Sequence, residues 1–85
     1  MERQEIFNRI VDIIHHNYLS AGEKLTEDTN LRDDLNADSL DLSCVGLDIE
    51  TTFQVEITDA ELEGMDTPTV GSIVDLVQKK LEGRP

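Results

Sequence analysis

Tryptophan is absent from this chain of 85 residues, cysteine occurs once, and aromatic residues make up only 4% of it. The single thiol, Cys44, cannot form an internal disulfide bond, and together with His15 and His16 it offers too few ligands for a zinc site. No apolar run approaches the roughly 20 residues that a membrane-spanning helix needs. We therefore expect no metal, no membrane insertion and a reducing compartment, the cytoplasm.

Positive charge is also scarce, because 7 Lys and Arg stand against 19 Asp and Glu, which gives a formal net charge of −12. Such a surface repels the phosphates of nucleic acids and of anionic membranes, so basic proteins are the expected partners. Between Glu27 and Asp66 the sole basic residue is Arg32. One side of the molecule should therefore be strongly negative.

The length of the chain fits one small domain over residues 1–85. A core of this size supplies only a few kcal/mol of net stability, and a helical bundle with short-range contacts is the simplest architecture that can do so. With a hydrophobic content of 38% and few aromatic residues, the core should be aliphatic. The expected fold class is all-α, a small four-helix bundle with three longer helices and one short helix.

The first helix is expected over residues 2–19, where apolar residues recur at intervals of three and four. Its buried face should contain Ile6, Ile10, Ile13 and Ile14. From there to Asn36 no period is sustained, which predicts a long loop between the first and second helices, part of which can form a short helical turn. The residues expected to pin this loop to the core are Leu25, Leu31 and Leu35.

Three further helices are expected over residues 38–52, 58–64 and 68–82. Thr58 and Glu61 have the spacing of a capping box, which predicts the start of the short helix, and Gly64 can close it. Either Thr67 or Thr69 can cap the last helix, with Pro68 tolerated in its first turn.

The second helix is expected to begin with a serine, Ser39, between two carboxylates. If Asp38 is the N-cap and Asp41 lies three residues on, the carboxylates satisfy the free backbone N–H groups, and the Ser39 hydroxyl stays exposed. A phosphodiester at this position would gain roughly 0.3 to 1 kcal/mol from the helix dipole. The position therefore suits an attached phosphate.

This stretch resembles the acyl carrier protein family, whose D-S-L motif holds the serine that receives 4'-phosphopantetheine from coenzyme A. The corresponding residues are Asp38, Ser39 and Leu40. The resemblance covers most of the chain. The other matching positions are Leu31 to Ala37, Glu50, Phe53, Glu56, Ile57, Asp59, Thr69 and Val70.

The resemblance implies a carrier and not an enzyme. A separate, magnesium-dependent phosphopantetheinyl transferase would modify Ser39, with Asp38 and Leu40 flanking the cofactor, and the thiol of the arm would carry acyl groups as thioesters. The pathway would be fatty acid biosynthesis or a related lipid or polyketide pathway. Acyl-loading and acyl-processing enzymes would dock on the carrier, expected to be a monomer, through basic patches. The acidic residues that we expect to receive them are Asp41, Asp48, Glu50 and Glu56.

Three positions depart from the family pattern. Asn36 stands where glycine is usual, and Cys44 replaces a recognition glutamate, where we interpret it as a small helical residue of low reactivity. Gly46 replaces a branched apolar residue and costs about 1 kcal/mol relative to alanine inside a helix. Two interpretations remain open for Gly46: the first is close helix packing or mere tolerance of a glycine, and the second is a larger space for an acyl chain.

Other functions are weighed against this one. Within the carrier class, the unusual run from Ser43 to Gly46 favours a specialised carrier, and an amino acid or a cell-wall precursor is the alternative cargo. An acidic calcium-binding helical module would need an oxygen ligand at Arg32, glycine at Asp33 and glutamate at Ser39 if its loop began at Asp28, and it has none of them. A hydrolase using Ser39 lacks a catalytic triad in sequence.

Overall fold

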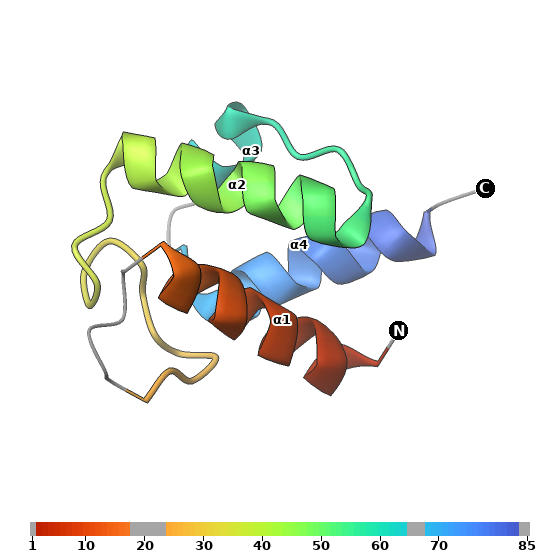
Figure 1. The fold of residues 1–85 in the computed structure, drawn as a ribbon, viewed down its shortest axis with the longest axis horizontal. Helices are drawn as coiled ribbons and strands as arrows, with labels where there is room; N and C mark the ends of the chain where they lie inside the picture. The colour runs from red at the N-terminus through yellow and green to blue at the C-terminus, as the bar shows by residue number, and fades with distance from the viewer. Residues whose placement is uncertain (1, 18–23, 65–67, 84–85) are drawn as a thin grey trace.

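The computed structural model describes residues 2–17, 24–64 and 68–83. Over these residues the secondary structure is helical except for one isolated bridge, which confirms the all-α expectation. The helices are α1 (Arg3–His16), α2 (Ser39–Phe53), α3 (Asp59–Glu63) and α4 (Val70–Glu82). Helix α1 packs against α4 and α2, and the short α3 packs against α2 (Figure 1). None of the helices described has the length and apolarity that crossing a membrane would require.

The core is aliphatic, as the composition predicts. The predicted face of α1 is buried, with Ile6, Ile10 and Ile14 wholly inaccessible to solvent. Helix α2 contributes Leu42, Val45, Ile49 and Phe53, and α4 contributes Val70, Ile73, Val74 and Val77. Because these side chains come from three long helices, the position of α2 is determined by burial along its whole length.

Helix α1 is described as ending at His16, with Asn17 as its C-cap. The Asn17 side-chain amide donates a hydrogen bond of 2.8 Å to the carbonyl of Ile13, which also accepts from the backbone N–H of Asn17 at 3.1 Å. The last two residues of the predicted helix, 18 and 19, lie outside the described residues.

The long loop before α2 is held in place at several points. Its leucines Leu25, Leu31 and Leu35 are buried, as predicted. The backbone N–H of Asp34 donates to the carbonyl of Asn30 at 2.8 Å, so part of the loop forms the helical turn that the sequence allows. Residues 29–31 also pair with residues 68–70, since Leu31 N–H donates to the Pro68 carbonyl at 2.9 Å.

The start of α4 differs from the prediction. The helix begins at Val70, and Thr69 is its N-cap, with the Thr69 hydroxyl accepting from the backbone N–H of Ser72 at 3.1 Å. Pro68 therefore precedes the helix, and its expected place in the first turn is wrong. The physical reason is the bridge to the loop, because backbone that pairs with Leu31 cannot also be helical. Thr67, the other candidate cap, lies outside the described residues.

The short helix α3 begins with the predicted capping box. Thr58 Oγ1 accepts from the backbone N–H of Glu61 at 3.2 Å, and Glu61 Oε1 accepts from the backbone N–H of Thr58 at 3.1 Å. Gly64 is the C-cap. A salt bridge of 2.9 Å between Lys80 Nζ and Glu61 Oε2 ties α3 to α4, and Leu62 is buried against α2.

Candidate functional site

The first turn of α2 has the predicted arrangement of carboxylates. Asp38 is the N-cap, and its Oδ1 accepts from the backbone N–H of Asp41 at 2.9 Å. Asp41 Oδ2 accepts in turn from the backbone N–H of Asp38 at 3.1 Å. Ser39 is the first residue of the helix and is exposed. Because the carboxylates cap the helix, the Ser39 hydroxyl takes part in no hydrogen bond with the described residues.

The approach to this turn explains one departure from the family pattern. Asn36 has a φ of 57°, a left-handed backbone conformation that is easiest for glycine and that asparagine tolerates better than most residues. The next residue, Ala37, is buried, and its N–H donates to the Leu31 carbonyl at 2.8 Å. The left-handed residue thus turns the chain from the buried loop toward the exposed N-cap.

Two leucines lie on the solvent side of α2. Leu40 is 72% exposed and Leu47 is 63% exposed, and with about 100° of rotation per residue, side chains seven positions apart point in nearly the same direction. Asp41 and Asp48 run along the edge of α2 that faces α1, where Asn17 Nδ2 donates to Asp48 Oδ2 at 2.9 Å. We call the surface of α2 formed by Ser39, Leu40, Asp41, Leu47, Asp48 and Glu50 the exposed face of α2.

The structure separates the predicted docking residues. By helical geometry Glu50 lies on the same edge as Ser39, away from the edge with Asp41 and Asp48. Glu56 is exposed but follows the end of α2, which is about 22 Å from Ser39 by the rise of a helix of 15 residues. The sequence reasoning missed Leu47, although its spacing of seven from Leu40 could have indicated a shared exposed side.

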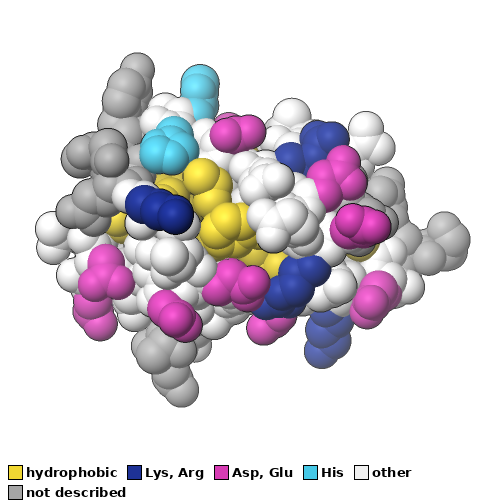
Figure 2. Space-filling view, turned by 90° about the horizontal axis from the view of Figure 1, so that it is seen from below, with side chains coloured by type: hydrophobic (Ala, Val, Ile, Leu, Met, Phe, Trp, Pro, Cys, Tyr) yellow, Lys and Arg dark blue, Asp and Glu magenta, His cyan; other side chains and the backbone are white. Residues whose placement is uncertain are grey.

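Negative charge dominates the side of the molecule that α2 and α3 form. Residues 39–64 contain no Lys or Arg. On the face seen from below, in contrast, dark blue Lys and Arg side chains lie among the carboxylates (Figure 2). The uneven distribution that the sequence indicates is therefore present in the folded chain, and the candidate site lies on its negative side.

Gly46 faces the interior of the bundle and not the solvent. A β-carbon built on it would lie 2.8 Å from Cδ1 of Leu62, which is closer than real contacts allow. Leu62 is 1% exposed and fills the space beside the glycine. A residue with a β-carbon at this position would force the end of the Leu62 side chain to shift, which supports the first interpretation of Gly46.

Two other features bear on the alternative functions, namely the thiol of Cys44 and the stretch compared with a calcium-binding loop. Cys44 is a free, exposed thiol on α2. In the stretch from Asp28 that resembles a calcium loop, Asn30 Oδ1 accepts from the backbone N–H groups of Arg32 and Asp33, each at 2.9 Å. Within the described ranges no three His, Cys, Asp or Glu side chains converge in a way that could hold a metal ion. The loop is therefore a hydrogen-bonded turn.

The structure thus presents an exposed hydroxyl at the start of a well-capped helix, on the negative side of a small all-α bundle. The chain matches the family model described as "Phosphopantetheine attachment site" over residues 5–77. It is 43% identical to the acyl carrier protein of Thermotoga maritima over 79 residues, which are 93% of this chain and 95% of that protein. The acyl carrier proteins of Lactobacillus johnsonii and Lactobacillus acidophilus are 38% and 41% identical, each over 92% of this chain and 95% of the relative. The chain belongs to the phosphopantetheine attachment family.

The described residues fit the cofactor of this family, 4'-phosphopantetheine. The first backbone N–H groups of α2, those of Ser39 and Leu40, have no intrahelical acceptor, and such groups at a helix N-terminus can donate to a phosphate. The capping carboxylates occupy other backbone groups, so attachment would not disturb the cap. The family's members are carriers, and the cofactor supplies the thiol that bears the cargo.

Proposed function

We propose that Ser39 is the attachment residue for 4'-phosphopantetheine and that the protein carries acyl groups as thioesters on this arm for fatty acid or related lipid or polyketide biosynthesis. The observation that supports this most directly is the exposed Ser39 hydroxyl, which makes no hydrogen bond with the described residues. A catalytic serine would need a base beside it, and the described neighbours are capping carboxylates already bonded to backbone N–H groups. The hydroxyl is therefore a substrate for another enzyme.

The modification replaces a phosphoanhydride bond of coenzyme A with a phosphate ester bond to the serine. The Ser39 oxygen forms a bond to the phosphorus of the pantetheine phosphate in coenzyme A, the bond from that phosphorus to the nucleotide breaks, and the serine proton leaves. A phosphopantetheinyl transferase supplies the base and the magnesium ion. The carrier contributes an accessible oxygen, two free N–H groups and the positive end of the α2 dipole.

The exposed face of α2 is the proposed docking surface for the transferase and for the acyl-loading and acyl-processing enzymes. Leu40 and Leu47 offer exposed apolar contact, and Asp41, Asp48 and Glu50 lie on either side of them. This arrangement suits a partner with an apolar contact surrounded by basic residues, because complementary charges speed association and orient the two proteins. Glu56 lies farther from Ser39 and would contact only a larger partner. A monomer in the cytoplasm, where the free thiol of Cys44 stays reduced, fits this role.

An acyl chain gains from leaving water by about 0.8 kcal/mol per methylene, so the aliphatic interior is its proposed shelter. In the structure Leu62 fills the space beside Gly46. The gain is therefore available only if Leu62 or α3 moves. The second interpretation of Gly46, a larger space for an acyl chain, therefore applies only when α3 moves. The glycine helps because it places no side chain in the path of that movement.

The test is the intact mass of the protein after incubation with coenzyme A and a permissive phosphopantetheinyl transferase. Wild type should gain one phosphopantetheine, and Ser39→Ala should gain none. Ser43→Ala is the matched control, because Ser43 lies on the same helix one turn later and should not affect the reaction. An unmodified wild type, or a Ser39→Ala protein that still gains the mass, would refute the assignment.

A further inference from the structure

Helix α3 is joined to α2 by packing and to α4 by a salt bridge. It has only five residues, and an isolated helix of fewer than about 12 residues is marginal in water, so its position depends on these contacts. Leu62 is 1% exposed and packs toward Gly46 of α2. On the other side Glu61 pairs with Lys80 of α4 at 2.9 Å. The apolar contact is buried, whereas the charged contact lies where solvent can reach it.

The carboxylate of Glu61 takes part in the cap of α3 and in the salt bridge at once. Its Oε1 accepts from the backbone N–H of Thr58 at 3.1 Å and from Lys80 Nζ at 3.1 Å. The side chains of Lys80 and Glu61 are 31% and 33% exposed, whereas the partners in the salt bridges of Arg3 and Arg9 are each at least 38% exposed. Since solvent screens exposed pairs more strongly, the bridge to Lys80 should contribute more than those do.

A pocket of about 360 Å³ lies beside this salt bridge. The residues that line it are Glu61, Leu76, Lys79, Lys80 and Gly83. Because there is space next to the charge pair, the Lys80 ammonium can leave Glu61 and remain hydrated without displacing a buried side chain. The bridge can therefore open while the core formed by α1, α2 and α4 stays packed.

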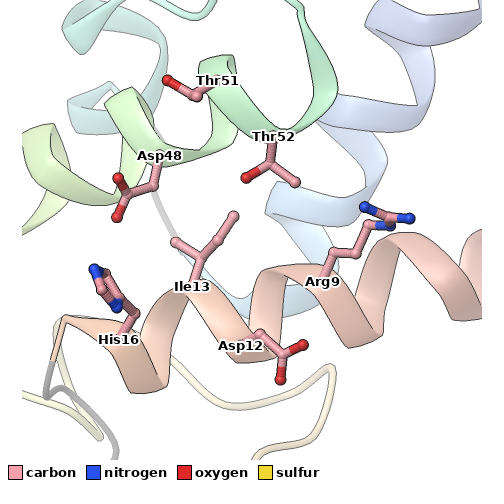
Figure 3. A pocket seen from close by; sticks show the side chains of 7 residues that line it. All are labelled: Arg9, Asp12, Ile13, His16, Asp48, Thr51 and Thr52. Atoms are coloured by element: carbon pink, nitrogen blue, oxygen red, sulfur yellow. The ribbon is translucent and has the colours of Figure 1, made fainter.

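On the α1 side of α2 the surface is polar. A cleft of about 410 Å³ lies between the two helices (Figure 3). Its polar lining consists of Arg9, Asp12 and His16 from α1, and of Asp48, Thr51 and Thr52 from α2. Ile13 at the same cleft is only 7% exposed, so its side chain closes the cleft toward the core. An acyl chain that entered here would pass charged groups, which removes the gain from leaving water.

On the α3 side of α2 the surface beside the core is apolar. Gly46 contributes no side chain, and Leu62 fills the space beside it. Gly46 lies seven residues after Ser39, so at about 100° per residue the two positions point in nearly the same direction, roughly 10 Å apart along the axis. An arm attached to Ser39 can therefore follow the edge of α2 that α3 covers.

We propose that Lys80 is a positioning residue for the cargo: its salt bridge to Glu61 holds α3 closed beside Gly46, and an acyl chain enters the core only when this bridge opens and Leu62 moves away. Lys80 acts through Glu61 and does not touch the cargo. The inference rests on the function proposed for Ser39, and it adds a residue that sets how readily the core is reached.

The size of the effect follows from the population of the open state. While that state is rare, a chain that binds only to it is sheltered in proportion to the fraction of molecules that are open. Loss of one partly exposed salt bridge should raise this fraction roughly 1.5-fold to 5-fold. Lys80→Met is the suitable change, because it removes the charge and leaves the bond between Glu61 and Thr58 in place.

The first experiment measures amide hydrogen exchange of the unmodified protein at urea concentrations below the unfolding transition. The amides of Leu62 and Gly64 donate to backbone carbonyls four residues earlier, so they exchange when α3 opens. Their exchange should depend weakly on urea, as a local opening does. The amide of Ile10, in the middle of α1, should follow global unfolding and depend steeply on urea.

Three variants separate the charge of Lys80 from other effects. Lys80→Met should raise the exchange rates of both α3 amides roughly 1.5-fold to 5-fold at every low urea concentration. Lys80→Arg restores a charge and should match wild type, and so should Lys79→Met, which removes a charge from the same pocket. Equal rates in Lys80→Met and Lys79→Met would overturn the proposal. So would α3 amides that exchange only with the steep urea dependence of Ile10.

The second experiment follows the cargo itself. A permissive transferase and octanoyl-coenzyme A load each protein at Ser39 with a chain whose terminal methyl is labelled with ¹³C. Free octanoyl-pantetheine gives the methyl signal of the chain in water, and the displacement from it reports the ratio of sheltered to solvated chain. This ratio should rise in Lys80→Met by the same factor as the exchange rates, and Lys79→Met and Lys80→Arg should keep the wild-type ratio.

The outcomes for Lys80 and for Ser39 can be told apart. An equal ratio in Lys80→Met and Lys79→Met would overturn the role of Lys80, as would a methyl signal at the position of free octanoyl-pantetheine in every variant. The intact mass at Ser39 is independent of both readouts. A protein that is never modified refutes the proposed function, and one that is fully modified without these responses refutes the role of Lys80 alone.

Discussion

The side chain of Leu62 occupies the space that a side chain on Gly46 would enter. A β-carbon at Gly46 would lie 2.8 Å from Leu62 Cδ1, and both positions are buried. The contact joins α2 to α3, and α3 is otherwise tied to the bundle by the salt bridge between Glu61 and Lys80. The two residues therefore form one packing unit, in which the size of one limits the size of the other.

This relationship predicts strong coupling between substitutions at the two positions. Leu62→Ala should cost about 2 to 4 kcal/mol of unfolding free energy, because it removes a buried side chain. Gly46→Ala gains about 1 kcal/mol in helix propensity, but the new methyl group meets Leu62, so the gain should be lost in wild type. In the Leu62→Ala background the gain should appear in full. Urea denaturation of wild type, Gly46→Ala, Leu62→Ala and the double variant measures the coupling.

The matched control repeats Gly46→Ala in a Leu47→Ala background. Leu47 is next to Gly46 in sequence but 63% exposed, so it should show no coupling. If Gly46→Ala has the same effect in all three backgrounds, the contact does not limit the size of residue 46.

A second prediction concerns the end of α2, where Gln54 is the C-cap with a φ of 55°. The left-handed conformation is strained for a residue with a β-carbon and free of strain for glycine. Gln54→Gly should therefore raise the unfolding free energy by about 0.5 to 1 kcal/mol, whereas Gln54→Ala should leave it nearly unchanged. Thermal unfolding of both variants tests this, and a glycine variant less stable than the alanine variant would contradict it.

Apolar periodicity and capping patterns, which depend only on residues close together in the chain, predicted most of the helical framework. The apolar periods gave the buried faces of α1, α2 and α4, and the two capping boxes appear at Asp38 and Thr58 as expected. Pro68 was placed wrongly because its surroundings depend on a loop some forty residues earlier in the chain, whose backbone pairs with it. Periodicity and propensity contain no information on such a long-range pairing.

The candidate site likewise has one part that the sequence could predict and another that it could not. The exposure of Ser39 follows from the spacing of Asp38 and Asp41, which is a local property. The relation of Asp48 to the end of α1 does not, because it needs the packing of two helices and the side chain of Asn17. Likewise the sequence left the role of Gly46 open, and the contact that supports close packing comes from Leu62 on another helix.

The third prediction uses the salt bridge between Glu61 and Lys80. The hydrogen bond from Lys80 is the main cause that lowers the pKa of Glu61 below its ordinary value of 4.5, and the backbone bond at Thr58 adds to it. A lowered folded-state pKa means that the stabilisation is present above the unfolded-state value and is lost as pH falls through the folded-state pKa. Lys80→Met should therefore cost about 0.2 to 1 kcal/mol at neutral pH and progressively less in acid.

Urea denaturation of wild type and Lys80→Met between neutral pH and pH 3 measures this difference. Lys79→Met is the control, because Lys79 lies on the same helix and is exposed, and no salt bridge with the described residues involves it. A Lys80→Met penalty that stays constant into acid would show that the lysine acts by packing its stem and not by its charge.

The last prediction concerns the charge of −12 as a whole. Because residues 39–64 contain no Lys or Arg, the carboxylates on that side repel one another more in the compact state than in the unfolded chain. Salt at about 0.15 M shortens the screening length to about 8 Å and should raise the melting temperature by several degrees over a low-salt buffer. Millimolar magnesium chloride should raise it more than sodium chloride of equal ionic strength, because a divalent ion collects more strongly between carboxylates. Scanning calorimetry in these four buffers measures both effects. A melting temperature that changes with neither salt would mean that the repulsion is already relieved within the folded chain.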